Sequence, residues 1–247
     1  MTAVLVHGLL ETERIWDGVV PLLEHEPVTL RLPGHGTARP ASFTATKEAY
    51  ADWLVSRIGG LPEPLDLVGH GWGGLFVLRA VTGLGLRVRS WVVDNAGGFH
   101  PGAEPDDLAL LAPSPEAALP RLVQAPASSP DSMIGILRLL GAPTAQAEAM
   151  GAALDATMAG CAVDLHRSAD PNVRAGWEMS ATPEPRARGL VVLPGADPYG
   201  AQTLAREVAA QLGARTQALD GLGHFWMLED PGRAADLLNR FWRGLER

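Results

Sequence analysis

One turn of this chain has the form of a nucleophile site but lacks the nucleophile. Residues 69–73 read Gly-His-Gly-Trp-Gly and follow an apolar run of strand length. A strand, a sharp glycine-rich turn and then a helix form the context in which an elevated serine attacks a substrate. Gly71 occupies the serine position and has no side chain. Further along, Asp197 and His224 each follow a short apolar run and offer a carboxylate and an imidazole, groups suited to acid–base chemistry.

The elements that must position these residues alternate along the chain. Short, nearly continuous apolar runs predict strands buried on both faces of a parallel sheet. Segments with helical periodicity separate them, so we expect a doubly wound α/β fold with right-handed crossovers. The expected strands are 3–6, 28–32, 65–68, 90–93, 190–193 and 215–219, and the expected helices are 14–24, 46–58, 74–82, 201–212 and 233–245.

The alternation stops between residues 97 and 185. This segment begins with a proline-rich stretch and continues with helical patterns near 132–140, 145–162 and 174–180. An insertion after the carboxyl end of a strand lies over the crevice in which open α/β sheets bind ligands. We therefore predict a helical lid at 97–185 and a core made of residues 1–96 and 186–247.

Five short motifs in a fixed order resemble the α/β-hydrolase superfamily. They are His7-Gly8, the segment 31–36 (Arg-Leu-Pro-Gly-His-Gly), the turn 69–74, the segment 195–198 (Gly-Ala-Asp-Pro) and the segment 221–225 (Gly-Leu-Gly-His-Phe). The chain is most similar to small members such as short esterases and hydroxynitrile lyases, without the family's first two strands. The resemblance implies an α/β-hydrolase fold: a mostly parallel, doubly wound sheet with a helical lid.

The resemblance also implies roles for individual residues. The family order of nucleophile, acid and histidine matches Gly71, Asp197 and His224. His224 would be the general base, and Asp197 would orient its ring. Asp94, after an earlier strand, is a second candidate for the acid. The backbone amides of Leu9 and Trp72 would form an oxyanion hole that needs no side chain at position 71.

Other side chains are candidates for the substrate pocket or for structural roles. His70 precedes the turn residue, and aromatic side chains could line an apolar pocket. The expected pocket residues are His70, Phe99, Trp177 and Trp226. His7 and His35 are expected to stabilise their loops.

The composition of the chain limits the kinds of partner that we expect it to bind. The net charge of −8 disfavours nucleic acid as a ligand, because phosphate binding requires a basic surface. No apolar run has the length of about 18–20 residues that a membrane span requires. The sequence shows neither a metal-ligand cluster nor a phosphate loop, so we expect no metal and no cofactor. A cytoplasmic monomer or homodimer that binds a small apolar or aromatic metabolite is the expectation.

Three functions remain open at this point. The first is general-base catalysis without a nucleophile: non-covalent hydrolysis, or a lyase, isomerase or cyclase reaction. The second is a serine ester or lactone hydrolase that carries an inactivating Ser-to-Gly substitution. The third is a non-catalytic small-molecule binding protein, against which the retention of both Asp197 and His224 counts.

Overall fold

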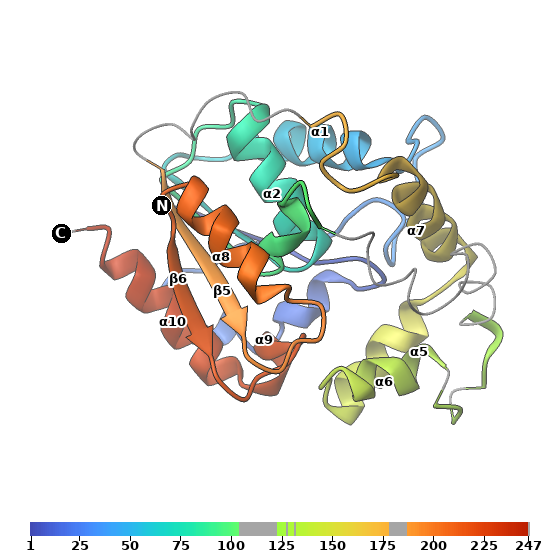
Figure 1. The fold of residues 1–247 in the computed structure, drawn as a ribbon. Coiled ribbons are helices and arrows are strands. Elements are labelled where there is room, and N and C mark those ends of the chain that lie inside the picture. Colours follow the sequence, from blue (N-terminus) through green and yellow to red (C-terminus); the bar gives the residue numbers. More distant parts are fainter. Residues whose placement is uncertain (104–122, 127, 131, 178–186, 247) are drawn as a thin grey trace.

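Six parallel strands form the central sheet, as the apolar runs predict (Figure 1). The structure is a computed structural model, and it describes residues 1–103, 123–126, 128–130, 132–177 and 187–246. The expected α/β architecture, a parallel sheet with helices on both faces, is confirmed. The strands are β1 (Thr2–Val6), β2 (Val28–Leu30), β3 (Leu65–Gly69), β4 (Ser90–Val93), β5 (Arg188–Pro194) and β6 (Arg215–Leu219).

The strand order, β2-β1-β3-β4-β5-β6, brings the chemistry-bearing loops to one edge. In the parallel register Val6 pairs with Gly69, and Gly69 pairs with Val93. The carboxyl ends of β1, β3 and β4 are therefore level. The residues that come next, His7, His70 and Asp94, emerge side by side at this edge.

Two apolar layers cover the sheet, one on each face. Val4 and Val6 point into a core with α1 (Lys47–Ile58), α2 (Trp72–Gly83) and α8 (Gln202–Gln211). Ala3 and Leu5 point into the opposite core, which contains α10 (Pro231–Arg243) and the 3-10 helix η1 (Glu13–Trp16). This division follows from the alternation of side chains along a strand.

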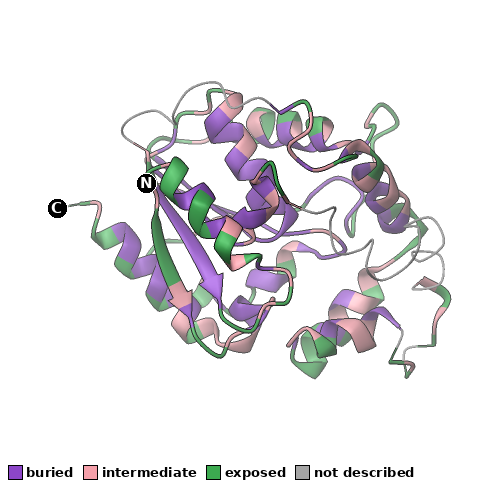
Figure 2. Cartoon of the chain, viewed as in Figure 1, coloured by how far each residue is buried: buried purple, intermediate pink, exposed green. Residues whose placement is uncertain are grey.

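The edge strand β6 differs from its neighbour β5. Figure 2 shows β5 buried along nearly its whole length, whereas the first half of β6 is exposed. Its exposed residues are Arg215, Thr216 and Gln217. Polar side chains at an edge oppose pairing with another chain.

The predicted helix at 14–24 is wrong. The structure has two short 3-10 helices there, η1 and η2 (Val20–Leu22). Gly18 lies between them, and Pro21 within η2 lacks an amide proton. An α-helix through this segment would lose a hydrogen bond at Pro21 and pay the backbone entropy of Gly18. Two further short helices flank the site, η3 (Ala96–Phe99) and α9 (Trp226–Glu229).

The segment between β4 and β5 contains α5 (Met133–Leu139), α6 (Thr144–Ala153) and α7 (Ala156–Ser168). The single helix expected at 145–162 is two helices, because Asp155 caps a new one by accepting from the Met158 amide at 2.8 Å. The helix expected at 174–180 is absent over 174–177, which form turns, and its remainder lies outside the described residues. Within the described chain, none of the helices is both long and apolar enough to cross a membrane.

Candidate active site

The turn between β3 and α2 is built from glycine for two physical reasons. Gly71 has φ +53° and ψ −124°, a conformation that L-residues rarely adopt. A Cβ on Gly69 would lie 2.6 Å from the Gly73 carbonyl oxygen, and one on Gly73 would collide with the His7 carbonyl. The strand and the helix thus approach too closely for larger residues at 69 and 73.

Gly71 itself has free space around it. Among the described residues, a Cβ built at this position meets only the Gly8 Cα, at 3.7 Å, which is an ordinary van der Waals contact. The space above the turn opens into a cavity whose lining includes Gly71 and His224. The turn therefore leaves room for a reacting group at the nucleophile position.

Asp197 and His224 lie together beside this space. His224, in the loop between β6 and α9, donates from Nδ1 to Asp197 Oδ2 at 3.1 Å. Asp197 follows β5, and its Oδ1 accepts from the Tyr199 amide at 2.9 Å. The Asp197 side chain is 1% exposed and that of His224 is 12% exposed. The carboxylate fixes the ring, and Nε2 is the nitrogen left for a substrate.

Asp94 does not contact His224; it has a separate role beneath the turn. Its Oδ1 accepts from the Gly71 amide at 2.7 Å. Its Oδ2 accepts from His70 Nδ1 at 2.6 Å and from Trp226 Nε1 at 2.6 Å. Although burial opposes the charge, these donors lower the pKa of Asp94. The carboxylate therefore anchors the turn, and Asp197 is the carboxylate that reaches His224.

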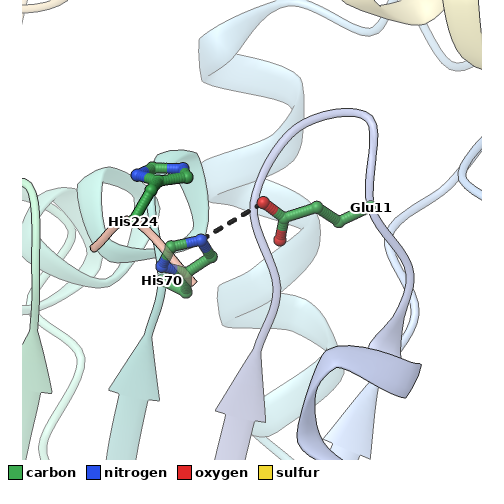
Figure 3. Close-up of side chains that lie close together, drawn as sticks. All are labelled: Glu11, His70 and His224. Carbon is green, nitrogen blue, oxygen red and sulfur yellow. Dashed lines mark ion pairs between the residues drawn. The ribbon is translucent and has the colours of Figure 1, made fainter. Parts of the chain in front are cut away.

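Glu11 is a second buried carboxylate at the same edge. Its Oε2 accepts from the Gly8 amide at 2.8 Å, and its Oε1 forms an ion pair with His70 Nε2 at 3.2 Å (Figure 3). Burial alone would neutralise His70, but Asp94 and Glu11 raise its pKa well above the ordinary value. In turn His70 lowers the pKa of Glu11. The site thus holds an imidazolium between two carboxylates.

The cavity above Gly71 is mostly apolar and has a volume of about 100 Å³. Its floor is the turn and the loop after β1, and α5 contributes one wall. The described lining residues are Leu9, Leu10, Glu11, Gly71, Trp72, Asn95, Met133, Ile136, Leu137, Leu140, Tyr199, His224 and Phe225. Within the described part of the chain, the amides of Leu9 and Trp72 donate to no other group. These two amides are available to a substrate oxygen.

The four residues predicted for the substrate pocket are not among those that line this cavity. His70 is fully buried beneath the turn, where both ring nitrogens face carboxylates. Trp226 is buried and donates to Asp94. Phe99 and Trp177 pack against each other, with ring centroids 6.2 Å apart, in the core that covers one face of the sheet. Apolar packing satisfies these aromatic rings, so they do not reach the cavity.

His7 and His35 hold the loops that follow β1 and β2. His7 Nε2 accepts from the Leu32 amide at 3.0 Å, and its other nitrogen contacts the Gly8 carbonyl oxygen. His35 Nδ1 lies 3.2 Å from the Pro33 carbonyl oxygen. Both rings are completely buried, and burial lowers the pKa of His35 to about 3. Both histidines therefore stabilise the loops in which they lie.

Comparison with known proteins identifies the family. The model of the Alpha/beta hydrolase family matches residues 3–237, nearly the whole chain. The chain belongs to this family.

The individual proteins to which the chain is similar are more distant. A segment is 38% identical over 82 residues to "Probable oxidoreductase EphD" of Mycobacterium tuberculosis, a match that covers 31% of this chain and 14% of that protein. The Bottromycin epimerase BotH shares the fold with a TM-score of 0.68 and 20% identity, over 99% of this chain and 90% of its own. The CarC enzyme, a serine hydrolase of carbazole degradation, has a TM-score of 0.74 and 16% identity, over 98% and 91% of the two chains. At these identities the structural matches establish the fold alone.

Three side chains of this site have the types that ligate metals. Glu11, His70 and His224 each offer an atom, and these atoms lie within 4.8 Å of one another. His70, however, lies between two carboxylates that favour its protonated form, and a protonated ring nitrogen has no lone pair for a metal. Glu11 and His70 are better described as part of a buried ion triad with Asp94, and His224 lies beside it.

Sequence reasoning missed Glu11, Asn95 and Tyr199 as residues of the cavity. Each had a signal, because each lies within a few residues of a motif at a strand end. Glu11 is three residues beyond Gly8, and Tyr199 is two residues beyond Asp197. Polar residues so close to the carboxyl edge of a parallel sheet are candidates for ligand contact.

Proposed function

We propose that this protein is an enzyme in which the His224–Asp197 pair acts as a general base without a covalent nucleophile. The observation that supports it most is the 3.1 Å contact between the two side chains beside the unfilled space over Gly71. A binding protein has no need of a histidine whose ring is fixed by a carboxylate. An oriented base, by contrast, is what proton transfer requires.

The surrounding groups suit an anionic transition state. The free amides of Leu9 and Trp72 both lie on the cavity, and Trp72 begins α2. Amides at a helix N-terminus stabilise developing negative charge, such as that of an oxyanion or enolate. The base and these donors would serve non-covalent hydrolysis as well as isomerase or lyase reactions. The named activity of one structural neighbour, an epimerase, is in keeping with that range.

The substrate we propose is a small apolar metabolite with a polar reacting centre. Met133, Ile136 and Leu137 of α5, with Leu140 just after it, form an apolar wall over Gly71. Their position supports the interpretation of the segment after β4 as a lid. Burial of an apolar group against this wall would hold the reacting atom near His224.

A second candidate is a serine ester or lactone hydrolase whose nucleophile has been replaced by glycine. The open space at Gly71 favours it, because a side chain fits there without a clash. The two functions differ in whether the chain as it stands turns over a substrate.

The test is a panel of reactions run with the wild type and with His224→Gln. The panel comprises p-nitrophenyl acetate, δ-valerolactone, styrene oxide and the exchange of phenylacetone α-protons in D₂O. We expect the wild type to accelerate at least one reaction. Loss of a general base should slow that reaction by roughly 10²–10⁴-fold.

The control is His25→Gln, the same substitution at an exposed histidine. It should leave the rate unchanged. If the wild type and His224→Gln are equal in every reaction of the panel, the proposal is refuted, and the candidates left are a hydrolase without its nucleophile and a binding site.

A further inference from the structure

We propose that Glu11 is a second catalytic group, which with His224 holds the water that attacks an ester or lactone carbonyl directly. The inference rests on the proposed function of His224 and makes it specific: the proton that the base removes is on a water oxygen. Both side chains line the cavity over Gly71, although they come from opposite ends of the chain. Figure 3 shows both of them beside His70.

The Glu11 carboxylate is held firmly in its position. Oε2 accepts the Gly8 amide proton at 2.8 Å, and Oε1 lies 3.2 Å from His70 Nε2. The residue is only 3% exposed, and it is among the residues that line the cavity. Contact with His70 keeps the carboxylate ionised, so it is available as an acceptor throughout the neutral pH range.

The spacing of the two groups matches one water molecule. A carboxylate oxygen of Glu11 and a ring nitrogen of His224 lie within 4.8 Å of each other. At the upper limit of that separation, two hydrogen bonds of about 2.8 Å would meet at a bridging oxygen at an angle of about 120°, and a shorter separation gives a smaller angle. A water can donate one hydrogen to each acceptor at such an angle. Its lone pairs then point away from both, toward the substrate.

Gly71 makes this arrangement possible. A side chain at this position would extend into the same space. In the part of the chain that the structure describes, only the Gly8 Cα comes within 4 Å of where a Cβ of residue 71 would lie. The water would thus take the place of a serine hydroxyl. His70 contributes indirectly, because its positive charge offsets that of Glu11 near the amides that must stabilise an oxyanion.

The reaction balances without any further reactant. The water O–H bond breaks as the oxygen forms a bond to the carbonyl carbon, and the proton passes to His224 Nε2. The carbonyl π electrons move onto its oxygen, which faces the amides of Leu9 and Trp72. Collapse of this intermediate expels the alcohol, which takes the proton from His224. Glu11 stays ionised throughout, and no acyl-enzyme forms.

The experiment measures steady-state hydrolysis of p-nitrophenyl acetate by the wild type, Glu11→Gln, Glu11→Asp and His224→Gln. Loss of one charge-assisted hydrogen bond to the water should lower kcat by roughly 10- to 100-fold in Glu11→Gln. KM should change less than twofold, since Glu11 does not hold the acyl group. Glu11→Asp keeps the charge but shortens the side chain, so it should also be slow.

The matched control is Glu13→Gln, which removes the same charge from a residue that pairs with Arg31 outside the cavity. It should keep the wild-type kcat. Thermal unfolding of each variant separates a catalytic loss from a loss of folded protein. Rapid-quench mass spectrometry of the wild type should show no acetylated protein.

Several results would overturn the inference. Equal kcat in Glu11→Gln and the wild type, with His224→Gln slow, would remove Glu11 from the mechanism and leave the base in place. An acetylated intermediate, loss of activity after dialysis against EDTA, or no hydrolysis by the wild type would each refute direct attack by this water. If His224→Gln also hydrolyses p-nitrophenyl acetate at the wild-type rate, the proposed function of His224 is refuted instead.

Discussion

Introducing a hydroxyl at position 71 should convert the site to covalent catalysis. In Gly71→Ser the nearest described atom to the new Cβ is the Gly8 Cα, at 3.7 Å, so the side chain fits against the described chain. We expect the serine to lower the free energy of unfolding through backbone strain, because φ of residue 71 is +53°. A non-glycine residue in such a region costs about 1–3 kcal/mol. For a domain of this size that corresponds to a fall of roughly 2–12 °C in Tm.

The kinetic signature should be a burst. If Asp197 and His224 are aligned with the turn, the serine will attack p-nitrophenyl acetate and release a first equivalent of nitrophenolate rapidly. The acetylated protein should accumulate and be detected by mass spectrometry. Gly71→Ala is the matched control, since it has the same backbone strain and no hydroxyl. It should lose the same stability and show no burst.

One result would refute this reasoning. If Gly71→Ser is folded, with a Tm equal to that of Gly71→Ala, yet gives neither burst nor acetylated protein, the His224 ring is not directed at the turn. The double variant Gly71→Ser/His224→Gln provides the complementary check. It should abolish the burst while the serine remains.

Two predictions concern stability. Asp94→Asn should lower the free energy of unfolding in urea by about 3 kcal/mol, because it leaves the buried His70 charge with one carboxylate fewer; Asp52→Asn, at an exposed position of α1, should change it little, and equal effects would contradict the anchoring role. His35 is buried with a pKa of about 3, against an ordinary 6.5, so the unfolded chain binds its proton first as the pH falls. The wild type should therefore lose stability below pH 6.5 faster than His35→Gln, by about 1.4 kcal/mol per pH unit for this group, and parallel curves would show that His35 is not neutral when folded.

Much of the fold could be predicted because its signals are local. Continuous apolar runs indicated all six strands, and the glycine pattern at 69–73 follows from the contact between strand and helix. The contact between Asp197 and His224 was also predictable, since both follow adjacent strands at one sheet edge.

The Glu11–His70 contact depended on tertiary structure. It requires Leu10 to adopt φ +59°, which turns Glu11 back toward the Gly8 amide, and no local propensity favours a leucine in that conformation. The direction of Trp177 and Trp226 was equally hidden. The direction of an aromatic side chain depends on where the nearest sheet face or buried hydrogen-bond acceptor lies. The residues next to it in the sequence do not indicate that position.

The bond from the Gly71 amide to Asp94 has a consequence for how this scaffold can change. The turn is shaped by its own backbone, by close glycines on either side and by a carboxylate from another strand. None of these depends on the side chain at position 71. The residues that shape the turn are thus different from the residue that would supply the attacking group. Substitution of residue 71 can therefore change the attacking group while the turn and the space above it stay in place. Such a scaffold can gain, lose or regain a covalent mechanism without rebuilding its core.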